Sequence, residues 1–325
     1  MDSYQQKRKI RVAALSILSN STLVLLKLAV GLFIGSVAIL SEAIHSGVDL
    51  VAALIAYVAV QASRKPADED HPFGHGKAEN ISGTIEAALI FVAAAWIIFE
   101  AVDKLLDPQP ISMVGWGVAV MLISSVANIA VSELLFRVAR DTESVALEAD
   151  AWHLRTDVYT SFGVMAGLGI IWGGAWLAPG VNLLWLDPVA AITVALLIIG
   201  AAYRLTVTAA RDLMDASIPP HEEDEIRTIV KTVYPRVHGF HKLRTRKSGN
   251  TRFVEFHAKV GPEMTVGDSH ALMHDITHLI ERRFPGSHIT IHTEPCDGKC
   301  DAECTGGCLL SGDERDMVRQ KKSSL

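Results

Sequence analysis

Residues 36–62 read SVAILSEAIHSGVDLVAALIAYVAVQA, and this stretch decides the fold class of the chain. It is apolar over most of its length, with ionisable side chains only at Glu42, His45 and Asp49. An apolar run of this length crosses a bilayer as one α-helix, because about 20 residues span the hydrocarbon core. Ionisable groups inside such a helix are costly and are therefore candidates for function. The stretch predicts a membrane protein with a functional site inside the membrane.

Five further apolar runs accompany this one. We predict six transmembrane helices, at 12–34, 36–62, 81–102, 112–136, 146–172 and 183–207. The composition of the 325-residue chain agrees, since 50% is hydrophobic and only 20% is charged, against about 25% charged in soluble proteins. The net charge of −6 offers no basic footprint, so we expect no nucleic-acid partner.

Lysine and arginine flank the predicted helices on one side of the membrane. They include Lys7, Arg8, Lys9, Arg11, Arg64, Lys65, Lys77, Arg137, Arg140, Arg204 and Arg211. The opposite loops carry only Lys104. Because basic residues favour the cytoplasmic side, both termini are predicted to be cytoplasmic. We expect a multi-pass protein of the cell (inner) membrane, with the lipid bilayer as its solvent.

The chain changes character after residue 211, where it becomes polar and rich in histidine. Residues 1–211 form the predicted transport domain, 212–294 a cytoplasmic domain and 295–325 a flexible tail. Helical periodicity at 221–233 and 266–284 alternates with strand patterns at 240–247, 251–260 and 288–293. The order αββαβ indicates a small ferredoxin-like or metallochaperone-like domain with an open sheet.

Two matched pairs of ligands lie in the second and fifth predicted helices. His45 and Asp49 are four residues apart, as are His153 and Asp157, and this spacing puts each pair on one helix face. Two imidazoles and two carboxylates suit a tetrahedral divalent cation, with zinc the natural fit. Metal and protons compete for these atoms, so alternating access to the two sides would exchange them. The alternative is a structural polar network between helices.

Other ionisable groups in these helices are interpreted differently. We expect Glu42, Glu148 and Asp150 to lie near helix ends, where water reaches them, and we do not assign them as ligands.

Further candidate ligands lie outside the membrane. Asp68, His71 and His75 are close enough in sequence to close on one ion, although a solvated loop would look the same. Neighbouring strands can bring His241, His257 and His292 together. The tail holds all four cysteines at an even spacing, and they are candidates for zinc, cadmium or copper(I) or for a redox or incidental role: Cys296, Cys300, Cys304 and Cys308.

At these motifs the chain resembles the cation diffusion facilitator family, and in particular its bacterial zinc and ferrous-iron efflux branch. The resemblance is carried by Ser41-Glu42-Ala43 leading to Asp49, by FGHGKAE at 73–79 and by LRTR at 243–246. It implies a homodimeric divalent metal/proton antiporter that exports metal from the cytoplasm, with His45, Asp49, His153 and Asp157 as the transport site. It further implies a cytoplasmic metal-binding set of His241, His257, His270, His292 and Glu294.

The resemblance also implies a charge interlock between Lys77 and Asp215, for which Asp212 is the competing partner and two unrelated surface charges are the alternative. The branch commonly has Asp where this chain has His45. Imidazole makes the site softer and less negative, which favours zinc or cadmium over manganese or ferrous iron.

Three functions are compatible with these features. The first is a zinc-preferring antiporter, for which cadmium and iron are further candidate substrates. In this case Zn²⁺ is both the substrate and a structural or regulatory ion, and we expect no organic cofactor. The second is a membrane-bound metal sensor or scaffold that does not transport. The third, an intramembrane metalloenzyme, would need an open coordination position and a base, as in His-Glu-x-x-His, and that motif does not occur. We therefore expect a secondary active transporter and not an enzyme.

Overall fold

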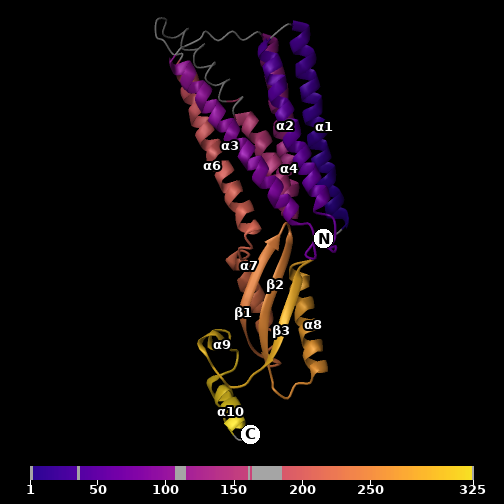
Figure 1. The fold of residues 1–325 in the computed structure, drawn as a ribbon, viewed down its shortest axis with the longest axis vertical. Coiled ribbons are helices and arrows are strands. Elements are labelled where there is room, and N and C mark those ends of the chain that lie inside the picture. Colours follow the sequence, from indigo (N-terminus) through magenta and orange to yellow (C-terminus); the bar gives the residue numbers. More distant parts are fainter. Residues whose placement is uncertain (1–2, 35–36, 107–114, 160–161, 163–184, 324–325) are drawn as a thin grey trace. The chain divides into compact units, whose positions relative to one another are not determined.

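A computed structural model describes residues 3–34, 37–106, 115–159, 162 and 185–323 (Figure 1). The chain divides into two compact units, one ending at Leu213 and one beginning at Met214, and each is described by itself.

The first unit is helical. Its elements are α1 (Ser3–Ile34), α2 (Val37–Ala62), α3 (Lys77–Leu106), α4 (Gly115–Thr142) and α6 (Leu186–Leu213), and residues 145–159 are also helical. Among the described residues, four stretches are long and apolar enough to cross a membrane: Tyr4–Val30, Lys77–Asp103, Leu122–Thr142 and Ala191–Leu213. In α2 the apolar helix found is the shorter Asp49–Ala62. Much of the fifth predicted helix lies outside the described residues, so the count of six stays a prediction.

The helix at 145–159 is buried on more than one side. Its Leu147 and Leu154 join an apolar cluster with side chains of α1, α2 and α4. Its Val145 and Ala149 join a second cluster with side chains of α3 and α6. Helices enclosed on several sides are apolar around their circumference, so a polar side chain here is removed from water. This helix carries His153 and Asp157.

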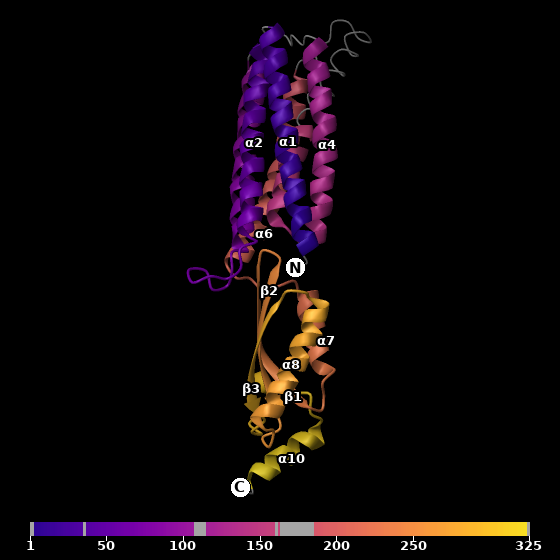
Figure 2. The same cartoon turned by 90° about the vertical axis from the view of Figure 1, so that its right-hand side faces the viewer.

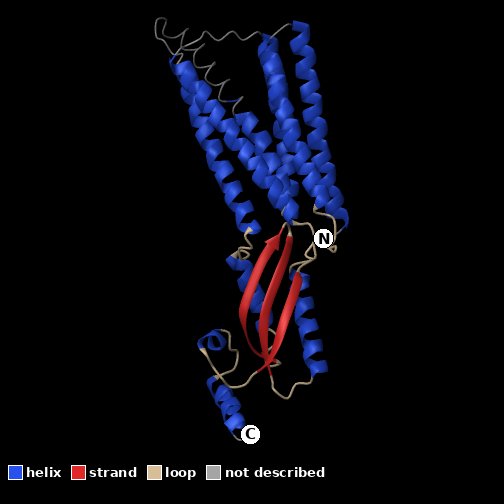
Figure 3. Cartoon of the chain, in the orientation of Figure 1, coloured by secondary structure: helices blue, strands red, loops and turns tan. Residues whose placement is uncertain are grey.

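The second unit contains α7 (Pro220–Lys231), β1 (Val237–Ser248), β2 (Thr251–Val260), α8 (Val266–Arg283) and β3 (His288–Pro295), in that order. Figure 3 shows its strands in red and its helices in blue. The sheet order is β1-β2-β3; β1 and β2 are antiparallel, and β2 and β3 are parallel. Gly249, at φ +59°, makes the turn between β1 and β2 with the left-handed conformation that glycine tolerates.

The sheet has one covered face and one open face. Both α7 and α8 lie on the same side of it (Figure 2). Thr265 caps the N-terminus of α8, because its side chain accepts a hydrogen bond from the Asp268 amide. The helix buries Leu272, Ile276 and Ile280 at a spacing of four. Alternate residues of β2, namely Val254, Phe256, Ala258 and Val260, are buried in the same core. The residues between them, including His257, face the open side.

The tail was expected to be flexible, but in the structure it folds back on the sheet. It forms α9 (Ala302–Gly306) and α10 (Gly312–Ser323), and Cys308 pairs with Gly239 of β1. The Phe240 amide donates to the Gly307 carbonyl at 3.0 Å, and the Leu309 amide donates to the His238 carbonyl at 2.8 Å. Composition did not reveal this pairing, because the tail binds the edge strand β1 through backbone hydrogen bonds and not through apolar side chains.

Candidate metal sites

Three of the four predicted transport ligands converge between α2 and the helix at 145–159. Asp49, His153 and Asp157 each offer a ligand atom, and these atoms lie within 4.8 Å of one another. Nε2 of His153 is 3.1 Å from Oδ1 of Asp49, and both side chains are 6% exposed. His45 lies in α2 one turn before Asp49, but its side chain lies outside the described residues. Its role stays a prediction.

Helix α1 contacts the part of α2 that carries this site. The buried ammonium of Lys27 donates to Oγ of Ser46 at 2.7 Å, and the Asn20 amide donates to the Asp49 carbonyl at 3.5 Å. Both contacts hold the part of α2 that carries Asp49. The second ring nitrogen of His153, Nδ1, is buried and has no hydrogen-bond partner among the described residues. A buried polar atom without a partner is costly unless a ligand completes it.

The burial of two carboxylates in the membrane unit was not predicted from the sequence. Asp150 is fully buried, so its expected hydration near a helix end was wrong; the cause is the packing of the 145–159 helix on several sides. Glu86 of α3 is also fully buried, and Ser82 donates to its Oε1 at 3.1 Å. Glu86 could have been found by the rule already applied to α2, because it is a carboxylate inside an apolar run.

A buried ion pair was missed entirely. Lys9 of α1 pairs with Glu79 of α3, and each side chain is only 1% exposed. The Glu79 carboxylate also accepts hydrogen bonds from Ser63, at 2.8 Å, and from Ser144. Sequence reasoning counted Lys9 among the flanking cations, yet its neighbour Arg8, paired with Asp141 at 2.6 Å, is the one that stays exposed.

The loop cluster comes together as predicted from its spacing, although it is open to solvent. One oxygen of Asp68 is 3.4 Å from Nδ1 of His71, and the other is 3.4 Å from Nε2 of His75. The His71 amide donates to the Asp68 carboxylate at 2.7 Å, and this bond lowers the pKa of that carboxyl. The three residues have the geometry to share one ion, and the side chain of Asp68 is 49% exposed.

The open face of the sheet gathers the cytoplasmic ligands. Glu294 of β3 is the centre of this group, because His241 Nε2 lies 3.2 Å from its Oε2 and His257 Nδ1 lies 2.6 Å from its Oε1. The Lys259 ammonium also lies 2.6 Å from Oε2, and mainly through this contact the pKa of Glu294 is lowered to about 2. Nε2 of His292 is 3.8 Å from Oε1 of Glu294.

Strand register produces this group. His241 of β1 lies opposite His257 of β2, which lies opposite His292 of β3. His270 is not part of it: it lies on α8, the helix that packs on the covered face, and its side chain is exposed.

The two halves of the predicted interlock each have a partner in their own unit. Lys77 donates to the Leu213 carbonyl at 3.2 Å, and the Asn80 amide donates to Asp212 at 3.0 Å. Asp215 pairs with Arg246 at 3.2 Å. Lys77 and Asp215 belong to different units, and their interlock stays a prediction.

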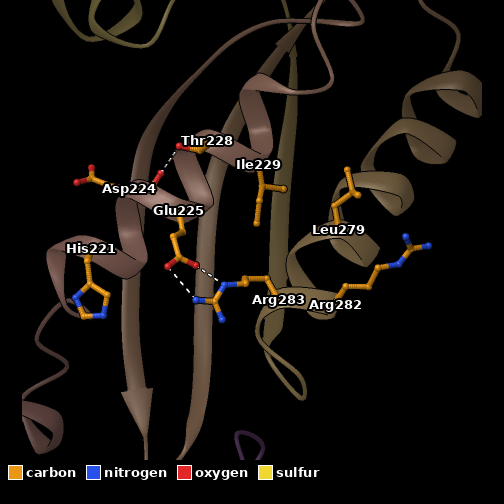
Figure 4. A pocket seen from close by; sticks show the side chains of 8 residues that line it. All are labelled: His221, Asp224, Glu225, Thr228, Ile229, Leu279, Arg282 and Arg283. Atoms are coloured by element: carbon orange, nitrogen blue, oxygen red, sulfur yellow. Dashed lines mark hydrogen bonds and ion pairs between the residues drawn. The ribbon is translucent and has the colours of Figure 1, made fainter.

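A surface pocket on the helical side of the cytoplasmic unit lies apart from the metal clusters. In it the Glu225 carboxylate pairs with Arg283, with one contact at 2.9 Å (Figure 4). These two opposite charges neutralise each other, and we assign the pocket no ligand. It is lined by His221, Asp224, Glu225, Thr228, Ile229, Leu279, Arg282 and Arg283.

The similarity of this chain to known proteins covers both units. Residues 13–214 match the cation efflux transmembrane domain, and residues 218–296 match the cytoplasmic domain of cation efflux proteins. A Synechocystis protein described as an uncharacterized transporter is 37% identical over 84% of this chain and 86% of its own length.

The cation-efflux pump FieF of Klebsiella pneumoniae is 34% identical over 88% of this chain and 92% of its own length. The metal-bound C-terminal domain of the CzcD transporter from Thermotoga maritima is 32% identical over 23% of this chain and 87% of that domain, with a TM-score of 0.22. The chain is therefore a multi-pass membrane protein that belongs to the cation diffusion facilitator family of cation efflux transporters.

Proposed function

We propose that this protein is a zinc-preferring divalent metal/proton antiporter that exports metal from the cytoplasm across the inner membrane. The observation that carries the proposal is the convergence of the buried Asp49 and His153 with the partly buried Asp157 between two helices. Two carboxylates and an imidazole at one point are costly in the membrane unless a cation or protons neutralise them. A relative at 34% identity is named a cation-efflux pump, which agrees with an exported cation.

Proton coupling follows from the chemistry of these ligands. Metal binding requires a neutral imidazole and ionised carboxylates, so metal and protons exclude each other at His153, Asp49 and Asp157. When the site faces the cytoplasm, metal displaces the protons. When it faces the other side, protons displace the metal and return with the empty carrier. Alternating access then exchanges the two species without further cofactors.

Zinc preference rests on His45. With His45 added to the three converging ligands, the site has two imidazoles and two carboxylates, a set that suits tetrahedral zinc and also admits cadmium. An all-carboxylate pair in α2 would favour harder cations.

The remaining clusters are assigned to regulation of a homodimer. His241, His257, His292 and Glu294 would bind metal on the open sheet face, with His270 contributing from elsewhere in the dimer. Metal bound more tightly by the dimer than by the monomer would stabilise the dimer by mass action. Asp68, His71 and His75 form a loop site, and Lys77 and Asp215 an interlock between the membrane and cytoplasmic domains.

The test is zinc flux into proteoliposomes with and without a pH gradient. Asp157→Asn should reduce flux to background, because the neutral amide removes one charge from the site, and zinc binding by the cytoplasmic cluster should be unchanged. The matched control is Asp103→Asn, a carboxylate on the exposed surface of α3. A wild-type protein that binds zinc but shows no flux under any gradient would instead be a membrane-bound sensor or scaffold.

A further inference from the structure

The cysteine-containing tail is built into the cytoplasmic unit at both of its ends. Cys296 follows β3 directly, and its amide donates to the Val260 carbonyl at 2.8 Å. Cys308 pairs with Gly239 of β1, which is itself opposite Lys259 of β2. The chain between the two cysteines therefore starts and finishes at the same end of one small sheet.

Close backbone contact makes the second attachment specific. A Cβ on Gly307 would lie 1.6 Å from the Phe240 carbonyl oxygen, and a Cβ on Gly239 would lie 2.9 Å from the Gly307 oxygen. Only glycine at 307 permits this approach, since the obstacle is backbone that cannot rotate away. The position of Cys308 beside β1 is thus fixed by the sequence around it.

The two middle cysteines are carried by a short turn and helix between these ends. Asp301 caps α9, and its side chain accepts a hydrogen bond from the Cys304 amide at 2.7 Å. Gly298, at φ +73°, turns the chain from Cys296 toward Cys300. All four thiols are free and partly buried.

The four thiols belong to one segment whose two ends are both held at the same end of the sheet. The pKa of the Cys304 thiol is raised first by burial and then by Cys308, Cys300 and Cys296. Thiolates that repel one another in this way are stabilised together by a cation placed among them.

We propose that Cys296, Cys300, Cys304 and Cys308 form a tetrathiolate site for one thiophilic divalent cation, zinc or cadmium. Four sulfurs without an imidazole or carboxylate suit a tetrahedral d¹⁰ ion, with Zn–S bonds of about 2.3 Å. Binding releases the thiol protons and leaves a complex of net negative charge. Burial lowers the pKa of Lys259 on the adjacent strand, but its bond to Glu294, and to a smaller extent Asp297 and Cys304, raise it.

The sulfurs close around the ion only when it binds. Among the described residues, the groups whose ligand atoms already lie within 4.8 Å of one another are the three nitrogen and oxygen clusters, and the cysteines are not in them. The turn at Gly298 and the short helix α9 would supply the movement. The tail is therefore expected to become more ordered with metal, and the site to be distinct from the transport site in both ligands and location.

The experiment is a cadmium titration of the reduced, full-length protein in detergent, followed by sulfur-to-cadmium charge-transfer absorption in the ultraviolet. All four cysteines of the chain lie in the tail, and the other clusters offer only nitrogen and oxygen, so this absorption reports the tail alone. It should saturate at one cadmium per chain, and protein loaded with zinc beforehand should develop the same absorption as cadmium displaces the zinc, because thiolates prefer the softer ion. Cys304→Ser should weaken binding at least tenfold, while the neighbouring Thr305→Ser should not.

Asp49→Ala should leave the absorption unchanged while it abolishes flux, which separates this site from the transport function. The proposal is overturned if no charge-transfer absorption develops, or if it does not saturate at one cadmium per chain. It is also overturned if Cys304→Ser and Thr305→Ser titrate alike. A thiol count of the starting protein ensures that all four cysteines are reduced before metal is added.

Discussion

The buried pair of Lys9 and Glu79 allows a quantitative prediction about the membrane unit. Lys9→Met removes the cation and leaves the Glu79 carboxylate enclosed, with hydroxyl partners at Ser63 and Ser144. Because both charged side chains are 1% exposed, no water replaces the lost ammonium. Breaking a buried pair from one side costs about 3–5 kcal/mol. Glu79→Gln should cost a similar amount, since it leaves the ammonium buried.

The double variant Lys9→Met/Glu79→Gln should be much less destabilised than either single variant. It removes both charges at once, and replacing a whole buried pair is often neutral. The double-mutant cycle should therefore give a coupling free energy of several kcal/mol.

The chain contains a matched control one residue away. Arg8 pairs with Asp141, but those side chains are 35% and 50% exposed. Solvent screens such a pair, so Arg8→Met should cost about 1 kcal/mol or less. The free energy of unfolding is measured by denaturant titration in detergent, followed by circular dichroism. If Lys9→Met costs no more than Arg8→Met, the reasoning from burial is refuted.

Three further predictions concern the metal sites and the tail. His45→Asp should shift selectivity from zinc toward iron and manganese in a competition flux assay, and unchanged selectivity would remove the role given to His45. Glu294 has its pKa lowered to about 2 from 4.5, so it adds stability above pH 4.5 that is lost as the pH falls toward 2. The free energy of unfolding of Glu294→Gln should lack this pH-dependent component, at most about 3 kcal/mol, when it is measured between pH 3 and 6. If the free energies of the wild type and the variant changed in parallel with pH, the prediction would be contradicted. Gly307→Ala should detach the tail from β1 at a cost of about 1–3 kcal/mol for two lost backbone hydrogen bonds, seen as faster exchange of the Phe240 and Leu309 amides. Gly312→Ala, with open space around its Cβ, is the control and should leave both amides protected.

Sequence periodicity predicted the cytoplasmic unit well, because its elements are defined by local patterns. The alternation at 251–260 and the turn around Gly249 agree with β2 and with the β1–β2 connection. The convergence of Asp49, His153 and Asp157 could also be predicted from their spacing, with the single assumption that the two helices face each other. The convergence of Glu294 with His241 and His257 was implied by family resemblance and is visible in their side-chain contacts, at 3.2 and 2.6 Å.

Local patterns failed where burial depends on packing between distant segments. Lys9 looked like Arg8 in sequence, yet only the packing of α1 on its neighbours decides which of them loses water. Asp150 was expected near water because its distance from the helix end is local information. Its burial comes instead from the packing of the 145–159 helix against α1, α2, α3, α4 and α6. The tail was expected to be flexible because it has few apolar residues. Its attachment to β1 is a backbone pairing, which composition does not show.

The sequence by itself determined that this is a membrane protein and which side chains can bind metal, since hydrophobic length and ligand chemistry are properties of the chain. The tertiary structure alone decided which of those side chains meet and which charges are removed from water. It brought the Cys296 and Cys308 backbones to one end of the sheet, and it enclosed Lys9 with Glu79. The physical reason is that a contact between distant residues depends on how whole elements pack, and the local pattern of either element does not contain that information.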